Sequence, residues 1–360
     1  GWSMRAAVYH GREDVRVEAI DEPAEPDAEE VRVAIDACGI CGSDLHEYAA
    51  GPIFIPDEEP HPVTGESLPI PMGHEFAGEV TDVGADVTSV SVGDRVAVNP
   101  IIYCDDCQFC AAGKYHLCEA GGFIGLSGDG GGLSETVVAP EEKLVRLPES
   151  VPTEYGALVE PFSVGLHAIH TSTLSAGDSV AVYGTGPIGL TVVQAARAAG
   201  ADEIYAVEPQ DSRRELAADV GADEAIDPTT TDAVDYVRDR VDGGVDVAFE
   251  VAGIEQTVQD AVATTAADGN CTIVSIFEEM VEIDPNEFVM HERTLSGTLA
   301  YEGGPRSDQE FETVVNMFDS GALDPEPLIT SRIALEDVVE DGFETLLDPD
   351  QEEVKVLVEP

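Results

Sequence analysis

Residues 179–208 read SVAVYGTGPIGLTVVQAARAAGADEIYAVE, and this stretch decides the fold of the second half of the chain. The pattern predicts an apolar strand over 179–184, an apolar helix over 187–199 and a second strand over 204–208. Helix and strand patterns of similar length alternate as far as residue 277. Because strands that alternate with such helices form parallel βαβ units, the predicted fold class is α/β with a doubly wound parallel sheet.

The turn between the first strand and its helix carries a glycine pattern that is typical of dinucleotide binding. In G-x-G-x-x-G, the first glycine permits a tight turn and the second lets a pyrophosphate approach the backbone. The third lets the helix pack closely on the strand, and the helix N-terminus faces the anion. The alternative is a glycine turn without a ligand. The candidate cofactor-binding residues are Gly184, Gly186, Pro187, Ile188 and Gly189.

The residues after the second strand bear on the choice of cofactor. Glu208 ends that strand, where a carboxylate can accept hydrogen bonds from both hydroxyls of an adenosine ribose, which favours NAD over NADP. Arg213 and Arg214 leave an alternative open, because either guanidinium could hold a 2′-phosphate. We expect both arginines on the solvent face of the next helix, with Arg213 kept as a cofactor-binding candidate.

Four cysteines lie close together in the pattern C-x2-C-x2-C-x7-C, and they are Cys104, Cys107, Cys110 and Cys118. Four thiolates are enough for one closed, tetrahedral zinc site. The surrounding segment has no long apolar run that could order it by packing, so a metal would supply that order. An iron–sulfur site, a redox cluster and two local disulfides are the alternatives, since iron–sulfur loops also use short cysteine spacings.

A second set of metal-ligand residue types is dispersed along the chain. A thiolate, an imidazole and a carboxylate with one water make an open zinc site of the kind used in catalysis. Spacing alone cannot bring these residues together. Each also has a simpler reading: His74 as a buried core histidine, Glu160 as a carboxylate at a helix start, and Cys38 with Cys41 as a redox pair. The candidates are Cys41, Ser43, His46, His74, Glu75 and Glu160.

The charge is unusually negative. The 360 residues contain 73 Asp and Glu against 17 Lys and Arg, a formal charge of −56. Nucleic-acid binding is disfavoured, because little in the chain could neutralise phosphates. Molar salt shortens the Debye length to about 3 Å and would screen the self-repulsion. The composition therefore favours a halophilic protein of a salt-rich cytoplasm over a merely acidic one.

Length and composition narrow the class further. The chain is long enough for two domains, and its hydrophobic fraction of 43% allows a sizeable core. We expect no membrane span, because no run of about 18 apolar residues occurs. No secretion signal is visible, and seven cysteines, an odd number, do not make a full disulfide framework. Metal binding and free thiols in a cytoplasmic protein are therefore expected.

The order of these motifs resembles the zinc-dependent medium-chain dehydrogenase/reductase family. The resemblance implies a GroES-like, mainly β catalytic domain over 1–155, a Rossmann NAD-binding domain over 156–297 and a return to the catalytic domain over 298–360. It further implies a catalytic zinc on Cys41 and His74 with Glu75 or Glu160 as carboxylate ligand, and a structural zinc on the four-cysteine loop. Ser43 and His46 resemble the family's proton relay.

Finer similarity points to a substrate class. Residues 38–75, 123–132 and 274–301 resemble the (R,R)-butanediol dehydrogenase group, which implies NAD-dependent oxidation of a secondary alcohol, a vicinal diol such as 2,3-butanediol, to acetoin. NADP is a possible cofactor. Polyol, sugar and L-threonine dehydrogenases are alternatives within the family, and a non-catalytic zinc- and nucleotide-binding regulator is the alternative outside it. We expect a homo-oligomer, a dimer or tetramer. The residue types in the insert over 51–72 do not by themselves explain a preference for any substrate.

Overall fold

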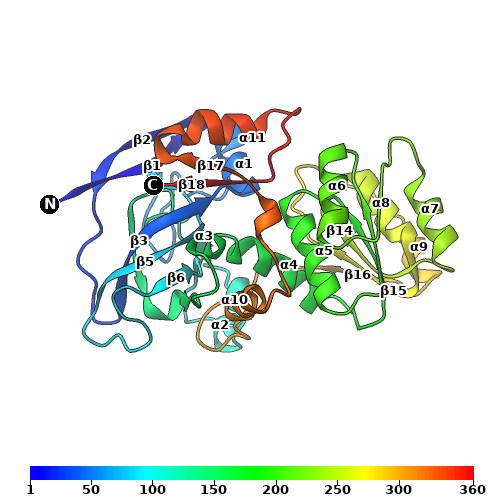
Figure 1. The fold of residues 1–360 in the computed structure, drawn as a ribbon, viewed down its shortest axis with the longest axis horizontal. Coiled ribbons are helices and arrows are strands. Elements are labelled where there is room, and N and C mark those ends of the chain that lie inside the picture. The colour runs from blue at the N-terminus through cyan, green and yellow to red at the C-terminus, as the bar shows by residue number, and fades with distance from the viewer. The chain divides into compact units, whose positions relative to one another are not determined.

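The computed structural model describes all 360 residues, which form two compact units (Figure 1). The first unit consists of Gly1–Glu160, Glu302–Ser320 and Ile329–Pro360, and the second of Pro161–Tyr301 and Gly321–Leu328. None of the helices combines the length and the apolar character needed to cross a lipid bilayer.

These units differ in their bounds from the domains drawn from the sequence at 155 and 297. The chain leaves the first unit after Glu160 and re-enters it at Glu302. Residues 321–328 belong to the second unit rather than to the first. Gln194 explains that reassignment, because its side-chain amide exchanges two hydrogen bonds of 2.8 Å with the backbone of Asp324.

The second unit is built on one parallel sheet of six strands in the order β13-β12-β11-β14-β15-β16. Its strands are β11 (Ser179–Tyr183), β12 (Glu203–Val207), β13 (Glu224–Ile226), β14 (Val245–Glu250), β15 (Thr265–Ile273) and β16 (Thr294–Gly297). The central strands are apolar along nearly their whole length because helices cover both faces. The predicted doubly wound α/β sheet is confirmed.

The helices of this unit follow its strands. They are α5 (Pro187–Ala198), α6 (Asp211–Val220), α7 (Ala233–Arg240), α8 (Glu255–Thr264) and the short α9 (Asn286–Val289). Figure 1 shows α5 and α6 on one face of the sheet and α7 and α8 on the other, and each pair packs together. Strand order reverses between β11 and β14, and in such sheets ligands bind beyond the carboxyl ends of the strands at that point.

The first unit is mainly β, as predicted. Its larger sheet runs β10-β6-β5-β3-β18-β17, with β9 also pairing with β3, and smaller sheets have the orders β2-β1-β4 and β7-β8. The strands are β1 (Ser3–Gly11), β2 (Asp14–Asp21), β3 (Glu30–Gly39), β4 (Ile70–Pro71), β5 (Glu75–Val83), β6 (Arg95–Val98), β7 (Ile101–Ile102), β8 (Gly122–Phe123), β9 (Thr136–Pro140), β10 (Leu144–Arg146), β17 (Ile329–Ala334) and β18 (Lys355–Glu359).

Helices of this unit are short and lie around the sheets. They are α1 (Gly42–Ala50), α2 (Gln108–Ala111), α3 (Thr153–Gly156), α10 (Glu310–Ser320) and α11 (Thr345–Leu347), with a π-helical segment at Val338–Glu344. Helix α4 (Val159–Thr171) begins in this unit and continues into the second. Short 3-10 turns occur at Tyr115–Leu117, Glu141–Lys143, Glu326–Leu328 and Leu335–Asp337.

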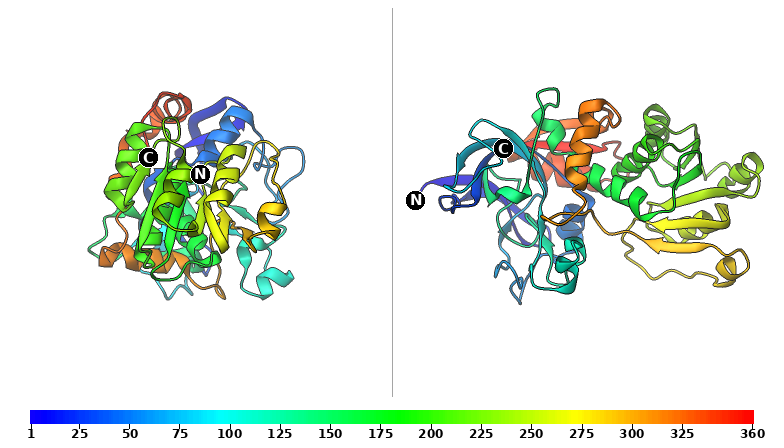
Figure 2. Two further views of the ribbon diagram at one scale, coloured as in Figure 1. Left: turned by 90° about the vertical axis from the view of Figure 1, so that its right-hand side faces the viewer. Right: turned by 90° about the horizontal axis from the view of Figure 1, so that it is seen from below.

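The C-terminal strand of the chain joins strands from the first 150 residues in the larger sheet. β18, the last strand, pairs with β3 in antiparallel and with β17 in parallel fashion. Figure 2 shows the whole chain, with the N and C ends marked, from two further sides. The core between the sheets is aliphatic and aromatic, with Val31, Val33, Phe76, Val96 and Val356 all buried. This pairing carries Lys355 of β18 into the interior beside the ends of β3 and β5.

Candidate metal centres and cofactor site

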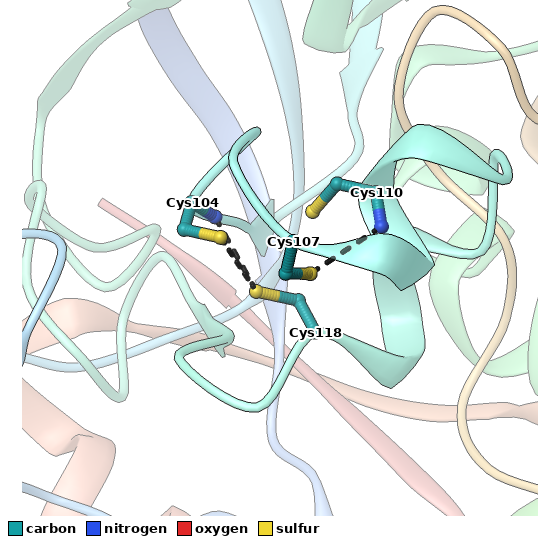
Figure 3. Close-up of side chains that lie close together, drawn as sticks. All are labelled: Cys104, Cys107, Cys110 and Cys118. Carbon is teal, nitrogen blue, oxygen red and sulfur yellow. Dashed lines mark hydrogen bonds between the residues drawn. The ribbon is translucent and has the colours of Figure 1, made fainter.

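The four cysteines of the C-x2-C-x2-C-x7-C loop converge. Their sulfur atoms all lie within 4.8 Å of one another, and in Figure 3 the four thiols face a common centre. Cys107 precedes α2, and its sulfur accepts the backbone N–H of Cys110 at 3.4 Å. Chiefly through that hydrogen bond, the pKa of Cys107 falls to about 7. Lowering the pKa favours the thiolate, which is the form that binds metal.

All four residues of this loop are free thiols, so neither local disulfide is formed. Four soft sulfur donors around one point suit a closed tetrahedral zinc. The donor set therefore fits the structural metal expected from the spacing, and it leaves no position for a substrate.

Packing that the sequence did not reveal supports this cysteine loop. The rings of Tyr103 and Tyr115 lie 4.3 Å apart, with Lys143 Nζ 4.7 Å from the first ring and the Arg306 guanidinium 5.4 Å from the second. Arg306 also donates to the carbonyl of Cys110 at 3.0 Å. These contacts add packing that the sequence did not predict, because two tilted aromatic rings lie against each other with a cation beside each ring.

The dispersed candidates also come together. One ligand atom each from Cys41, His74 and Glu75 lies within a group no wider than 4.8 Å, and His74 and Glu75 are buried. Glu160 Oε2 lies 3.8 Å from His74 Nε2. Burial is the main reason why the pKa of Glu160 rises to about 8.

Several polar atoms of this buried centre lack a hydrogen-bond partner. They are Glu75 Oε2 and Glu160 Oε2, together with Asp44 Oδ1 and His74 Nδ1, which face each other 3.5 Å apart. An unsatisfied buried polar group costs about 1–3 kcal/mol. A thiol, an imidazole and one of the two carboxyls therefore fit a zinc ion whose fourth position stays open for a small molecule.

Two residues that the sequence reading missed hold this centre in place. Asp44 is fully buried; its Oδ2 accepts the N–H of Cys41 at 3.0 Å, and its Oδ1 lies 3.5 Å from His74 Nδ1. Burial alone would lower the pKa of His74, but the charges and hydrogen bonds of Asp44 and Cys41 together raise that pKa well above its usual value. The motif Cys-Gly-Ser-Asp was a signal for Asp44, since outer carboxylates commonly orient metal-binding histidines.

Lys355 is the other missed residue. Its Nζ donates to Glu75 Oε1 at 2.8 Å and to the carbonyl of Ile40 at 2.9 Å, with both side chains of the ion pair buried. Burial would lower its pKa, but the charge of Glu75 raises it above the usual value. A lysine among the apolar residues of strand β18, in a chain with only three lysines, was the available signal.

The predicted relay residues lie on the first turns of α1. Ser43 Oγ is 3.5 Å from His74 Nε2, so its hydroxyl lies directly at the buried centre. His46 is exposed and follows three residues later, a spacing that places two side chains on one face of a helix.

The glycine motif of the second unit has the predicted local geometry. Gly184 ends β11 with φ +99°, and a Cβ there would lie 2.9 Å from the backbone of Val251. A Cβ on Gly189 would come within 1.9 Å of the Gly184 carbonyl, so helix and strand can approach only because both residues are glycine. Gly186 caps α5 and Pro187 occupies its first turn, which leaves the helix N-terminus open to an anion.

The carboxylate beside this motif is held by backbone groups. Glu208 is buried and accepts the N–H groups of Thr185 and Gln210, both at 3.0 Å. Arg213 was expected on the solvent face of α6, but it lies over the glycine turn instead. Its Nη1 is 3.6 Å from the position that a Cβ on Gly186 would occupy. Its buried Nε has no partner.

Arg214 is not on the solvent face either. It donates to the carbonyls of Glu208 at 2.9 Å and Pro209 at 2.7 Å, and it pairs with Asp211. These bonds close the turn after β12 and leave Arg213 as the guanidinium next to the motif.

Comparison with known families defines the class of this protein. Residues 27–149 match the alcohol dehydrogenase GroES-like domain, and residues 187–320 match the zinc-binding dehydrogenase domain. The chain therefore belongs to the zinc-binding alcohol dehydrogenase family and is an oxidoreductase, which confirms the resemblance seen in the motifs.

Individual relatives cover the whole chain. It is 46% identical to the (R,R)-butanediol dehydrogenase of Bacillus subtilis over 99% of this chain and 100% of the relative. The crystal structure of 2R,3R-butanediol dehydrogenase from B. subtilis superposes with a TM-score of 0.93, at 46% identity and over 99% and 100% of the two chains. The chain is 33% identical to the sorbitol dehydrogenase of B. subtilis, over 99% and 98% of the two chains.

A solved relative also carries a nicotinamide cofactor. An alcohol dehydrogenase from Escherichia coli, complexed with NADH, has a TM-score of 0.87 at 27% identity over 100% of both chains. With the zinc-binding family match, this likeness agrees with the expected cofactors, zinc and NAD(P).

Proposed function

We propose that this chain oxidises a small vicinal diol, with 2,3-butanediol as the best candidate and acetoin as its product, and that it passes the hydride to NAD. The likeness at 46% identity to a butanediol dehydrogenase over the full chain carries the proposal. The buried centre at Cys41 supports it, because it offers the ligands of an open metal site in the same unit as the relay residues.

Cys41 and His74 would hold the catalytic zinc, with carboxylate from Glu75 or Glu160. Zinc supplies Lewis acidity, which lowers the pKa of an alcohol. Lys355 binds Oε1 of Glu75, and Oε2 of Glu75 and Oε2 of Glu160 both lack a hydrogen-bond partner. Both carboxylates are therefore candidates, and Glu75 is the one whose ligand atom groups with those of Cys41 and His74.

Proton removal falls to the side chains of α1. The Ser43 hydroxyl can accept the proton of the alcohol and donate its own, since a hydroxyl does both. His46 is exposed to solvent one turn further on, and imidazoles as a class titrate near neutral pH. A proton released at the buried centre would thus leave through Ser43 and His46.

For the cofactor, we propose that Gly184, Gly186, Pro187, Ile188 and Gly189 receive the pyrophosphate and that Glu208 binds the adenosine ribose. The buried carboxylate of Glu208 would repel a 2′-phosphate, which favours NAD by about a hundredfold in kcat/KM. Arg213 lies close enough to the motif to contact either cofactor. Better activity with NADP than with NAD would contradict the role given to Glu208.

The four cysteines of the loop, Cys104, Cys107, Cys110 and Cys118, would hold a second, structural zinc. We propose in addition that the protein works in concentrated salt inside a halophilic cell, on the evidence of the −56 charge. Transfer from molar KCl to dilute buffer should lower the melting temperature, as repulsion between carboxylates is no longer screened. An unchanged melting temperature would contradict this proposal.

A homo-oligomer is part of the proposal. β16 is an edge strand of the parallel sheet, and exposed apolar side chains lie before and after it, with Val289 73%, Met290 74% and Leu299 48% exposed. Exposed apolar patches of this kind favour association. Light scattering in molar salt should give a multiple of the 38.0 kDa chain mass, and Met290→Glu should reduce it.

One experiment tests the main proposal. NADH formation from a panel of diols, polyols, sugars and L-threonine, measured in molar KCl, should show the highest kcat/KM for 2,3-butanediol. The second candidate is a polyol dehydrogenase, which the 33% identity to a sorbitol dehydrogenase favours. A preference for sorbitol would select it, and NAD binding without turnover of any alcohol would select a regulatory role.

A further inference from the structure

The insert over residues 51–72 leads directly into His74, and it is hydrogen-bonded to the loop over 121–130. One contact comes from His61, whose Nε2 lies 3.0 Å from the carbonyl of Gly121. Its Nδ1 accepts the backbone N–H of Thr64 at 3.3 Å. An Nδ1 that accepts requires Nε2 to carry the proton, so the imidazole donates across to the second loop.

Two further bonds complete the attachment. Thr64 Oγ1 donates to the carbonyl of Ser127 at 2.7 Å, and Glu66 Oε2 accepts the N–H of Asp129 at 2.7 Å. The two segments are in close contact: a Cβ on Gly128, whose φ is +121°, would lie 2.4 Å from Glu66 Oε2. The 121–130 loop therefore has little freedom to move relative to the insert.

The other side of the 121–130 loop faces the buried centre. Ser127, which Thr64 holds, accepts the N–H of Phe123 on its own Oγ at 3.1 Å. The Phe123 ring lies 6.0 Å from the His74 ring, tilted by 53°. A Cβ on Gly125 would lie 2.0 Å from the carbonyl of Gly73, the residue before His74. A single chain of contacts thus runs from the insert through Ser127 to the ring beside His74.

We propose that His61, Thr64 and Glu66 clamp the 121–130 loop and so fix Phe123 against His74, where the ring limits the size of the alcohol that the centre accepts. This inference rests on the proposed function. An apolar ring at that position suits the methyl end of a short diol, and an apolar wall discriminates by about 10- to 200-fold per methylene. His61, Thr64 and Glu66 are positioning residues that determine specificity through Phe123.

The test compares kcat/KM for 2,3-butanediol with that for 3,4-hexanediol. Phe123→Ala should lower the ratio by at least about tenfold. Thr64→Val keeps the shape but removes the hydroxyl, and the loss of one such hydrogen bond should lower the ratio by about fivefold. In Phe123→Ala protein, adding Thr64→Val should change nothing more, because coupled residues are not additive. Thr313→Val is the matched control: that hydroxyl donates to the Gln309 carbonyl at 3.2 Å, and the ratio should not change.

Hydrogen exchange gives a readout that does not depend on activity. Amides of residues 121–130 should exchange faster in Thr64→Val than in the wild type, and Thr313→Val should leave them unchanged. If Thr64→Val does not fold, Glu66→Ala tests the clamp in the same way, with Glu66→Gln restoring the acceptor. Three results would each overturn the clamp. The first is an equal loss of kcat/KM on both diols, and the second is a Thr64→Val effect that persists in Phe123→Ala protein. The third is an unchanged rate of amide exchange in residues 121–130 of Thr64→Val.

Failure of the proposed function is a separate result. If the wild type prefers polyols, the diol proposal fails, and the clamp is tested by the ratio between the shortest and longest polyols it oxidises. If no alcohol is oxidised, the exchange rates of the amides in residues 121–130 of Thr64→Val, compared with the wild type, decide whether the clamp exists.

Discussion

The two candidate metal centres of the first unit differ in how their ligands are brought together. The cysteine loop takes all four sulfurs from residues 104–118, where α2 and its flanking turns set the geometry. The buried centre takes Cys41 from the start of α1, His74 and Glu75 from the start of β5, and Glu160 from the start of α4. The first centre is local in sequence, whereas the second exists only when the sheets are assembled.

This difference separates stability from chemistry. The cysteine loop would use all four of its sulfur donors on one ion and is braced by the tilted ring pair of Tyr103 and Tyr115, so loss of the ion should affect folding. The buried centre keeps unpaired donor atoms and a serine hydroxyl beside His74, so its loss should affect turnover. Each prediction below tests that separation.

The largest expected effect is on activity. Cys41→Ser should lower kcat/KM by more than about 100-fold, since loss of a mere outer-shell partner already costs 10–100-fold. The melting temperature should change little, because Cys41 caps only a short helix. Cys271→Ala, a buried thiol of the second unit, is the control and should keep its activity. Near-normal turnover by Cys41→Ser would show that the buried centre is not catalytic.

The second largest effect is expected on stability, from the same cysteine-to-serine change in the cysteine loop. Cys107→Ser should lower the free energy of unfolding by at least about 3 kcal/mol, because metal binding is coupled to folding. Elemental analysis should give two zincs per chain for the wild type and one for this variant. If Cys107→Ser kept two zincs and its stability did not change, the cysteine loop would not hold a structural zinc.

Asp44→Asn should act on the buried centre alone. Loss of the charge beside His74 should weaken zinc retention against a chelator and lower kcat by about 10- to 100-fold. The zinc of the cysteine loop should be unaffected. If both metals become labile together, the two centres are not independent.

His46→Gln addresses proton release. Alcohol oxidation should slow by about tenfold at pH 6 and by much less above pH 8, where hydroxide replaces the missing base; general-base loss costs about 10²–10⁴-fold at most. Added imidazole should restore part of the rate. A uniform loss at every pH, with a raised KM for NAD, would instead place His46 in cofactor packing.

The smallest effect concerns the bracing of the cysteine loop. Arg306→Leu removes the donor to the Cys110 carbonyl and the ion pair with Asp105, and should cost about 1 kcal/mol of unfolding free energy without changing kcat. Arg146→Leu, which breaks an exposed pair with Asp94, should cost almost nothing. Equal losses in the two variants would show that the contacts of Arg306 add no support to the cysteine loop.

Local features were predictable from the sequence because their causes lie within a few residues. The strand predicted over 179–184 spans Ser179–Tyr183, and the helix predicted over 187–199 spans Pro187–Ala198, opened by the glycine motif as expected. Other boundaries depend on distant residues. Helix α8 ends at Thr264, where the chain turns directly into β15, because Thr265 pairs with Val245 of β14, a partner outside any local pattern.

The sequence by itself determined the α/β class, the cysteine loop and the dinucleotide motif, since periodicity, spacing and glycine chemistry act over short distances. Only the tertiary structure decided that Glu160 reaches His74, that Arg213 lies over the glycine turn and that Lys355 pairs with Glu75. The physical reason is that strand pairing and burial join residues far apart along the chain. The ion pair of Lys355 and Glu75 spans 280 positions, and no spacing rule reaches that far.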